Sequence, residues 1–262
     1  MTRLLRSEWR KVLTTKLWWG MLIGCVALTA LGVVSQIASD VNSHAGGPPG
    51  VAVPDLLSQA MTQRNIASTA AAAGIFAIIV GIILVTTEFR HLTSRPTFLV
   101  QPRRGHVLAA KLVVAAAVGL LYAVACVLTD LAIMVPWLAA RGVTIEWTGG
   151  GVLRTLAGAL VAVAIGAIVG VGVGVLVRNQ IAAVIGALAY FLIVEPLLSV
   201  IPYVNDAYRF LPGAASNALV DPGSGGFPGG SLTQLQGGLL TLGWGLFFAG
   251  MGWLITLRRD IP

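Results

Sequence analysis

The sequence predicts an all-α membrane protein with six transmembrane helices and both termini in the cytoplasm. Two features of the composition predict this class: 56% of the 262 residues are apolar and only 10% are charged, whereas soluble domains usually carry about 25% charged residues. The third is the arrangement of the apolar residues, which form long runs instead of the alternating pattern of a membrane β-barrel. We expect one transmembrane domain over residues 1–262.

The first element is expected at residues 1–16, as an amphipathic helix that lies in the lipid headgroup layer. Its apolar residues share one helical face: Leu5, Trp9, Val12 and Leu13. Arg6 and Arg10 lie on another face. A basic membrane anchor with no further role is the alternative. Trp18 and Trp19 follow where an aromatic belt at the membrane surface is expected.

The next elements are the spans, each of which needs about 20 apolar residues to cross about 30 Å of hydrocarbon. Six runs qualify: residues 17–38, 66–86, 112–138, 152–177, 181–201 and 237–257. The first run is too long for a removable signal peptide and lacks a small-residue cleavage site. Gly166, Gly170 and Gly174 repeat every four residues in the fourth span, which allows a neighbouring helix to pack closely.

The distribution of Lys and Arg predicts the orientation in the cell membrane. Thirteen of them lie on the side of the termini and four on the other side, and the basic side faces the cytoplasm. On this reading residues 39–65 and 202–236 are the long outer connections. The loop between the second and third spans is then the largest feature of the inner face.

That loop reads EFRHLTSRPTFLVQPRRGHVLAAK from Glu88 to Lys111. Thr93-Ser94 offers an N-cap and Pro96 suits the first turn of a helix. We expect a cytoplasmic helix of about two turns that displays Phe98 and Leu99 among arginines. An exposed apolar patch with a basic rim is typical of a protein docking surface. The alternative is that the arginines only set the topology.

Charged residues inside the spans need a specific reason, because burying a charge in lipid is costly. Glu195 lies in the outer half of the fifth span, beside Pro196, which removes a helix hydrogen bond and favours a break. Either Glu195 is a structural carboxylate or it belongs to an outward gate. Asp130 is expected near the outer headgroups. Lys111 is expected to extend its ammonium group to the membrane surface.

Catalytic and metal chemistry are not indicated by the remaining residues. Cys25 and Cys126 lie in apolar runs without metal-ligand spacing, and the three histidines are far apart in loops. None of the three lysines follows a glycine as in a phosphate-binding loop. The sequence therefore predicts no catalytic residue, no bound metal and no ATPase activity in this chain.

Four segments together resemble the six-span permease subunits of type-2 ABC exporters, particularly the small actinobacterial kind. They are RSEWRKVLTTKLWW (6–19), EFRHLTSRPTFLVQPRRGHVLAAK (88–111), GVGVLVRNQIAAVIG (172–186), and the segment 194–219 that begins VEPLLSVIP and ends RFLPGAASNAL. They span nearly the whole chain.

The resemblance implies that two permease subunits, identical or homologous, pair and sit on two separate ATPase subunits, which hold ATP and Mg²⁺. In that family the amino-terminal helix and the loop after the second span contact the ATPase. Carried over to this sequence, the implied coupling residues are Glu8, Arg10, Lys11, Glu88, Arg95, Phe98, Leu99, Arg103 and Arg104. The net charge of +7 fits anionic lipid and such a partner better than nucleic acid.

The expected function is the export of an amphipathic or hydrophobic molecule, such as a drug, antibiotic or lipid, since the spans contain few polar groups. One alternative is an ion- or proton-coupled carrier with Glu195 and Asp130 as relays. Such carriers favour broken helices in matching halves, and Glu195-Pro196 has no counterpart. Another alternative is a non-transporting membrane scaffold or immunity protein.

Overall fold

The computed structural model describes residues 2–45, 59–72, 74–90, 104–201, 204–221 and 232–257. All of its regular elements within these ranges are helices, which confirms the all-α class. They are α1 (Thr2–Thr14), α2 (Leu17–Ala45), α3 (Ala60–Ala72), α4 (Gly74–Arg90), α6 (Arg104–Ala140), α7 (Val152–Val177), α8 (Gln180–Ala189), η2 (Tyr190–Val194), α9 (Glu195–Ser199), α10 (Asn205–Tyr208), α11 (Pro212–Val220), α12 (Gln234–Gly252) and η4 (Trp253–Leu257).

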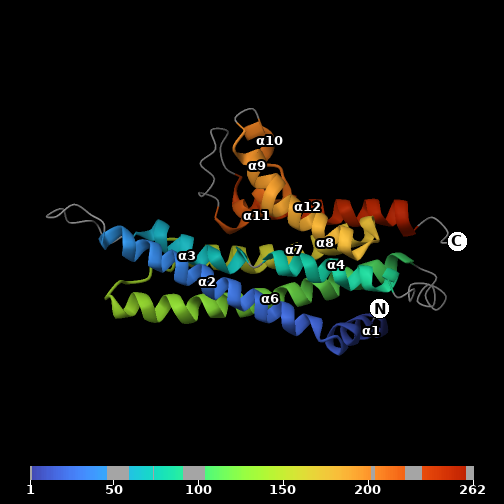
Figure 1. Ribbon diagram of the computed structural model, residues 1–262, viewed down its shortest axis with the longest axis horizontal. Coiled ribbons are helices and arrows are strands. Elements are labelled where there is room, and N and C mark those ends of the chain that lie inside the picture. Colours follow the sequence, from blue (N-terminus) through green and yellow to red (C-terminus); the bar gives the residue numbers. More distant parts are fainter. Residues whose placement is uncertain are drawn as a thin grey trace.

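Within the described residues, six stretches are long and apolar enough to cross a membrane, as predicted. They are Leu17–Ser39, Ala60–Arg90, Gly105–Ala140, Val152–Val177, Gln180–Ser199 and Gln234–Ile255. The second and third extend beyond the apolar runs, because their ends pack against protein: Val107 and Leu108 at the start of α6 are buried. Figure 1 shows α1 and η4 at one end of the bundle, called the terminal end below; the opposite, distal end carries the loop between α6 and α7.

Helix α7 forms the centre of the bundle. Buried residues make up 61% of its most apolar stretch, against 17% for the fifth span and 22% for the sixth. The predicted glycine stripe faces α4: a Cβ atom on Gly170 would lie 2.1 Å from the carbonyl oxygen of Ile78. Gly81 of α4 packs reciprocally, since its Cβ would lie 2.2 Å from the carbonyl oxygen of Ala167. The two backbones are therefore in direct contact, as small residues permit between membrane helices.

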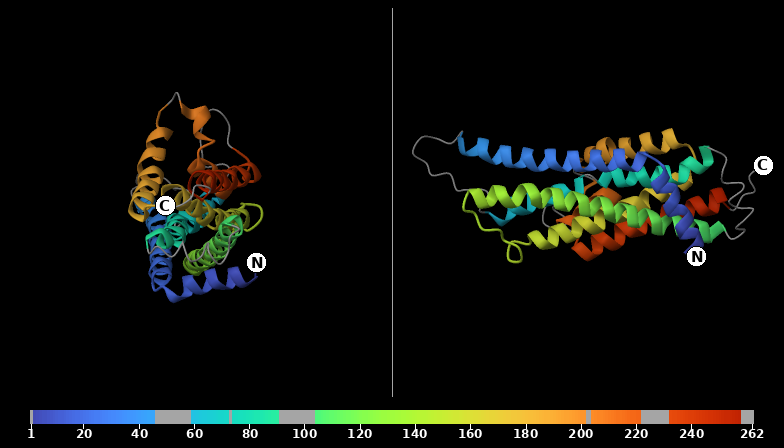
Figure 2. Two further views of the ribbon diagram at one scale, coloured as in Figure 1. Left: turned by 90° about the vertical axis from the view of Figure 1, so that its right-hand side faces the viewer. Right: turned by 90° about the horizontal axis from the view of Figure 1, so that it is seen from below.

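Helix α1 crosses the terminal end at an angle to the spans (Figure 2, right). Its apolar residues Leu5, Trp9 and Val12 pack against the core of the bundle, while Leu13 remains 49% exposed. The apolar face of α1 that the sequence predicted thus packs mainly against the helical bundle, and these contacts attach α1 to the spans.

The fifth span rises away from the bundle towards α10 (Figure 1) and exposes large apolar side chains such as Ile181 and Leu197. The break expected at Pro196 is absent, and the helix remains continuous through it. Residues Tyr190–Val194 form a widened π-helical turn, in which the N–H of Glu195 donates to the carbonyl of Tyr190. A π turn relieves the clash of a proline ring with the preceding turn, so the helix continues past Pro196.

Candidate functional site

Four charged side chains from three helices meet at the terminal end and form what we call the ionic cluster. Glu8 and Lys11 come from α1, Glu88 from the end of α4, and Lys111 from the first turns of α6. Lys111 Nζ lies 2.7 Å from Glu8 Oε2 and 2.7 Å from Glu88 Oε1. Lys11 Nζ lies 2.5 Å from Glu8 Oε1 and 2.7 Å from the same Glu88 oxygen. Two carboxylates and two ammonium groups thus balance each other.

Burial makes this balance necessary. The side chains of Glu8 and Lys111 are 1% and 5% exposed, and a buried charge is tolerated only when it is paired and hydrogen-bonded. Lys111 also donates to the carbonyl oxygen of Leu84 at 3.4 Å, so each of its three N–H groups has an acceptor. The prediction that Lys111 extends to the membrane surface is wrong, because the two carboxylates hold it inside the protein.

Lys11 occupies the outer edge of the ionic cluster, with its side chain 48% exposed. Partial burial lowers the pKa of Lys11, but hydrogen bonds to Glu8 and Glu88 outweigh it and raise the pKa above 10.5. Lys11 therefore stays charged at neutral pH and links α1 to α4 from the surface.

The remaining coupling residues implied by the resemblance fall into two groups. Arg10 is exposed on α1, and Arg104 is the first residue of α6. Arg95, Phe98, Leu99 and Arg103 lie outside the described residues, as does the helix expected around them. The structure does describe the two helix ends that this loop joins, which are Arg90 of α4 and Arg104 of α6. The ionic cluster connects both of these helices to α1.

A cavity of about 380 Å³ opens beside the ionic cluster, between the α1–α2 corner and α4. Its floor is apolar, with Leu17, Trp18, Val80 and Ile83 among its lining residues. Glu8, Lys11 and Glu88 form its charged edge. The cavity therefore presents an apolar surface and a charged rim at the terminal end of the bundle.

The second predicted site, Glu195, is 3% exposed and contacts the start of α11. Its Oε1 accepts a hydrogen bond of 2.6 Å from the backbone N–H of Ala214. The first turn of a helix has unpaired N–H groups and a partial positive charge, so a carboxylate is well placed there. A Cβ atom on Gly213 would lie 2.5 Å from Glu195 Oε2, so glycine is required for this approach. This hydrogen bond from Ala214 to Glu195 thus connects the start of α11 to the fifth span.

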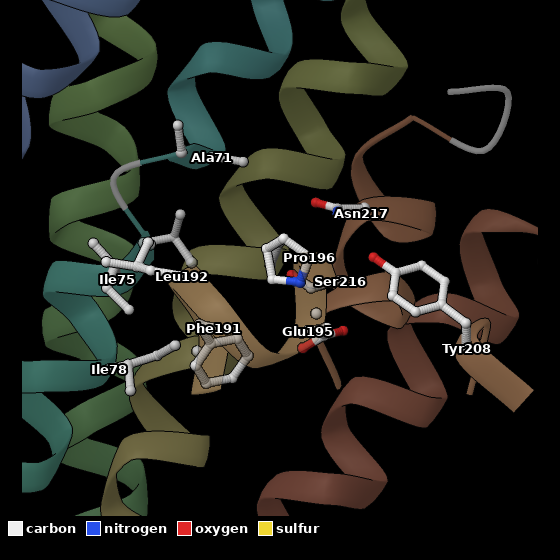
Figure 3. A pocket seen from close by; sticks show the side chains of 16 residues that line it. Ala71, Ile75, Ile78, Phe191, Leu192, Glu195, Pro196, Tyr208, Ser216 and Asn217 are labelled. Carbon is white, nitrogen blue, oxygen red and sulfur yellow. The ribbon is translucent and has the colours of Figure 1, made fainter. Parts of the chain in front are cut away.

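Glu195 and Pro196 also line a cavity of about 240 Å³ between α3–α4, α7 and the fifth span. Figure 3 shows Ile75 and Ile78 on one side and Tyr208, Ser216 and Asn217 on the other. The cavity is thus apolar towards the bundle and polar towards α10 and α11, next to the widened turn of the fifth span.

Asp130 lies inside the protein rather than among the outer headgroups. It is 0% exposed, and its Oδ2 accepts a hydrogen bond of 3.1 Å from Thr69 of α3. Its other oxygen has no hydrogen-bond partner among the described residues. The expectation from distance along the helix failed because α6 packs against α3 at this level, which removes Asp130 from water. Nearby, the Cys25 and Cys126 sulfur atoms lie 3.1 Å apart, and both cysteines are buried.

The sequence indicated Glu8, Lys11, Glu88 and Glu195 but missed their partners. Lys111, Gly213 and Ala214 are separated from them by many residues, so no local pattern joins them. One signal was available: Glu8 and Glu88 are acidic residues in the most basic parts of the chain. Within the described ranges, no group of three or more His, Cys, Asp or Glu side chains could hold a metal ion.

Comparison with known proteins adds one match. A sequence model for the ABC-2 family transporter protein matches residues 2–249. No curated protein and no solved structure matches the chain significantly.

Proposed function

The chain belongs to the ABC-2 family of transporter proteins, and from that premise we propose that it is the membrane subunit of an ATP-driven exporter in the cell membrane. The family match over residues 2–249 is the observation that carries this proposal. Members of the family are multi-pass membrane subunits, generally without catalytic activity, that work with a separate ATPase. Two copies of this chain, or this chain and a homologue, pair on two ATPase subunits that hold ATP and Mg²⁺.

The ionic cluster supports a specific route for coupling. With both termini in the cytoplasm, the loop of residues 91–103 meets the ATPase through Phe98 and Leu99, with Arg95, Arg103 and Arg104 around them. Arg10 of α1 adds to that surface. Glu8, Lys11 and Glu88 act behind it: with Lys111 they hold α1, α4 and α6 together by contacts of 2.5–2.7 Å. A displacement of the loop is then passed to three helices as one unit.

The cavities support an amphipathic or hydrophobic substrate. The cavity beside the ionic cluster is apolar with a charged rim, which suits a molecule with one polar and one apolar part. The cavity beside Glu195 lies farther along the bundle and is bordered by the widened turn of the fifth span. In this scheme Glu195 and Pro196 belong to the outward gate, and Glu195 moves α11 together with the span.

The coupling surface is tested by co-purification with any ATPase that is encoded beside this chain. We expect a stable complex that is lost when Phe98→Asp and Leu99→Asp are combined, because two charges replace the apolar contact. Size-exclusion chromatography in mild detergent measures the complex, and a thermal unfolding curve of the permease alone shows that the bundle is folded.

The matched control combines Thr144→Asp and Thr148→Asp, which adds the same charge to exposed positions between α6 and α7 at the distal end. This variant should bind the ATPase normally. A complex that survives the change at Phe98 and Leu99 would remove the coupling role from the loop, and a complex lost equally in the control would show that added charge alone disrupts it.

A further inference from the structure

A cavity of about 500 Å³ lies at the distal end, away from the ionic cluster and from Glu195. It is formed by Arg64 of α3, the loop between α6 and α7, the first turns of α7, and Asp221 at the end of α11. Figure 2 (right) shows this loop at the opposite end of the bundle from α1. Neither the coupling route nor the gate described above uses these residues.

The charged residues that line this distal cavity leave one positive charge in excess. Arg64 Nη1 lies 3.8 Å from Asp221 Oδ1, which is beyond hydrogen-bond distance. The Nε of Arg64 is buried and has no hydrogen-bond partner among the described residues. Arg154 carries the second positive charge. Glu146 is not part of the lining, but its carboxylate lies beside the loop: a Cβ atom on Gly149, which lines the cavity, would lie 3.1 Å from Glu146 Oε2.

Arg154 is held in place by Gln234. Its Nε donates to Gln234 Oε1 at 2.6 Å, and Gln234 Nε2 donates to the Arg154 carbonyl at 2.9 Å. This reciprocal pair joins the starts of α7 and α12 and positions the guanidinium group. A guanidinium group has five N–H donors in a planar fork that matches a phosphate. The pair with Gln234 uses one of them.

The backbone of the loop makes room beside Arg64. Gly151 has φ = +82°, and a Cβ atom there would lie 3.3 Å from Arg64 Cδ. As the N-cap of α7, Gly151 also supplies no side chain to the first turn. The positive end of this helix dipole therefore adds to the two arginines in attracting an anion.

Apolar side chains complete the distal cavity. Trp147 and Leu153 belong to its lining, and they are 42% and 56% exposed. Tryptophan at the end of a membrane span is typical of the level where lipid headgroups meet acyl chains. A ligand in the distal cavity would contact both positively charged and apolar side chains.

We propose that the distal cavity binds a lipid-like molecule through a single phosphodiester group, with its apolar part against Trp147 and Leu153. A phosphodiester carries one negative charge at neutral pH, which matches the excess of one positive charge. Arg64 and Arg154 bind its oxygens, and the tail extends into the adjoining membrane. The inference concerns binding to this chain alone and does not depend on ATP-driven transport.

Native mass spectrometry of the purified full chain tests the site with added phosphatidylglycerol. We expect binding of the first lipid to weaken about tenfold or more when Arg64→Gln and Arg154→Gln are combined, because hydrogen bonds to a charged group are lost. Diacylglycerol, which lacks the phosphate, and glycerophosphoglycerol, which lacks the tails, should each bind at least about tenfold more weakly than the whole lipid.

Arg141→Gln is the matched control, since Arg141 lies at the same end, stacks over Trp137 and does not line the cavity. It should leave lipid binding unchanged. The proposal is overturned if the double variant binds normally while unfolding like the native chain, or if Arg141→Gln weakens binding equally. Equal binding of glycerophosphoglycerol would also overturn it, because the site would then be one for a soluble phosphate compound.

Discussion

Two of the buried carboxylate sites of this bundle, the ionic cluster and Glu195, are stabilised by different partners. At the terminal end, Glu8 and Glu88 are neutralised by the ammonium groups of Lys11 and Lys111. In the fifth span, Glu195 bonds instead to the backbone N–H of Ala214 at the start of α11. The first arrangement balances full charges, whereas the second sets one charge against a helix terminus. The stability of the ionic cluster should therefore depend on each of its charges. The stability of the Glu195 site should depend on how closely the neighbouring backbone can approach the carboxylate.

The largest expected effect comes from Lys111→Met, which removes the buried cation and keeps a side chain of similar length. Glu8 and Glu88 would then share only the partly exposed Lys11. An uncompensated buried charge costs about 3–5 kcal/mol. Unfolding in detergent, followed by circular dichroism, measures the loss.

Two further variants show whether charge is the cause. Adding Glu8→Gln to Lys111→Met restores the balance between Glu88 and Lys11, and it should recover much of the stability. Lys16→Met removes an exposed lysine that lies outside the ionic cluster, and it should change little. A double variant that is less stable than Lys111→Met alone would contradict the charge-balance explanation.

A smaller effect is expected from Gly213→Ala, which tests shape at Glu195. The new Cβ atom would lie 2.5–2.6 Å from the carboxylate atoms, and overpacking of this kind costs about 1–3 kcal/mol. The same unfolding assay measures it. In a Glu195→Ala background the collision is absent, so the additional cost should fall below about 0.5 kcal/mol.

Gly186→Ala is the control for this pair, because a Cβ atom there meets nothing within 4 Å. It lies inside α8, where alanine is favoured over glycine by about 1 kcal/mol. A cost at Gly213 that persists without the Glu195 side chain would show that α11, rather than the carboxylate, requires glycine.

The smallest effect is expected from Glu195→Gln, which keeps an oxygen that can accept from Ala214, replaces the other carboxylate oxygen with an NH2 group, and removes the charge. A charge at a helix N-terminus contributes about 0.3–1 kcal/mol, so the protein should fold. In the assembled transporter, ATPase activity should be retained and transport modestly reduced, as for a gate residue. Both are measured in reconstituted vesicles. Collapse of expression would instead assign Glu195 an essential structural role.

The locally coded parts of the fold were predictable from the sequence. The apolar runs located all six spans, because a helix satisfies its own backbone hydrogen bonds and needs only length and hydrophobicity to cross a membrane. The glycine repeat of α7 and the amphipathic face of α1 were also visible in the sequence, because each is a pattern within a single helix. Even so, the sequence did not identify α4 as the partner of the glycine stripe, because both partners are helices of small and apolar residues.

Burial was decided only by the tertiary structure. Lys111 was expected at the membrane surface, from its place at the start of a span, and Asp130 among the headgroups, from its distance along the helix, and both are buried. Lys111 is buried because Glu8, 103 residues earlier, supplies the opposite charge. The helix continues through Pro196 because the preceding turn widens, and Glu195 Oε1 accepts its hydrogen bond from a helix that begins 17 residues later in the chain.

The sequence by itself determined which segments enter the membrane and which end is basic, since both depend on the composition of single segments. Only the tertiary structure decided which charges neutralise each other and which side chains lie away from water. The physical reason is that the free energy of a buried charge depends on its neighbours in space. In this chain those neighbours come from helices far apart in the sequence.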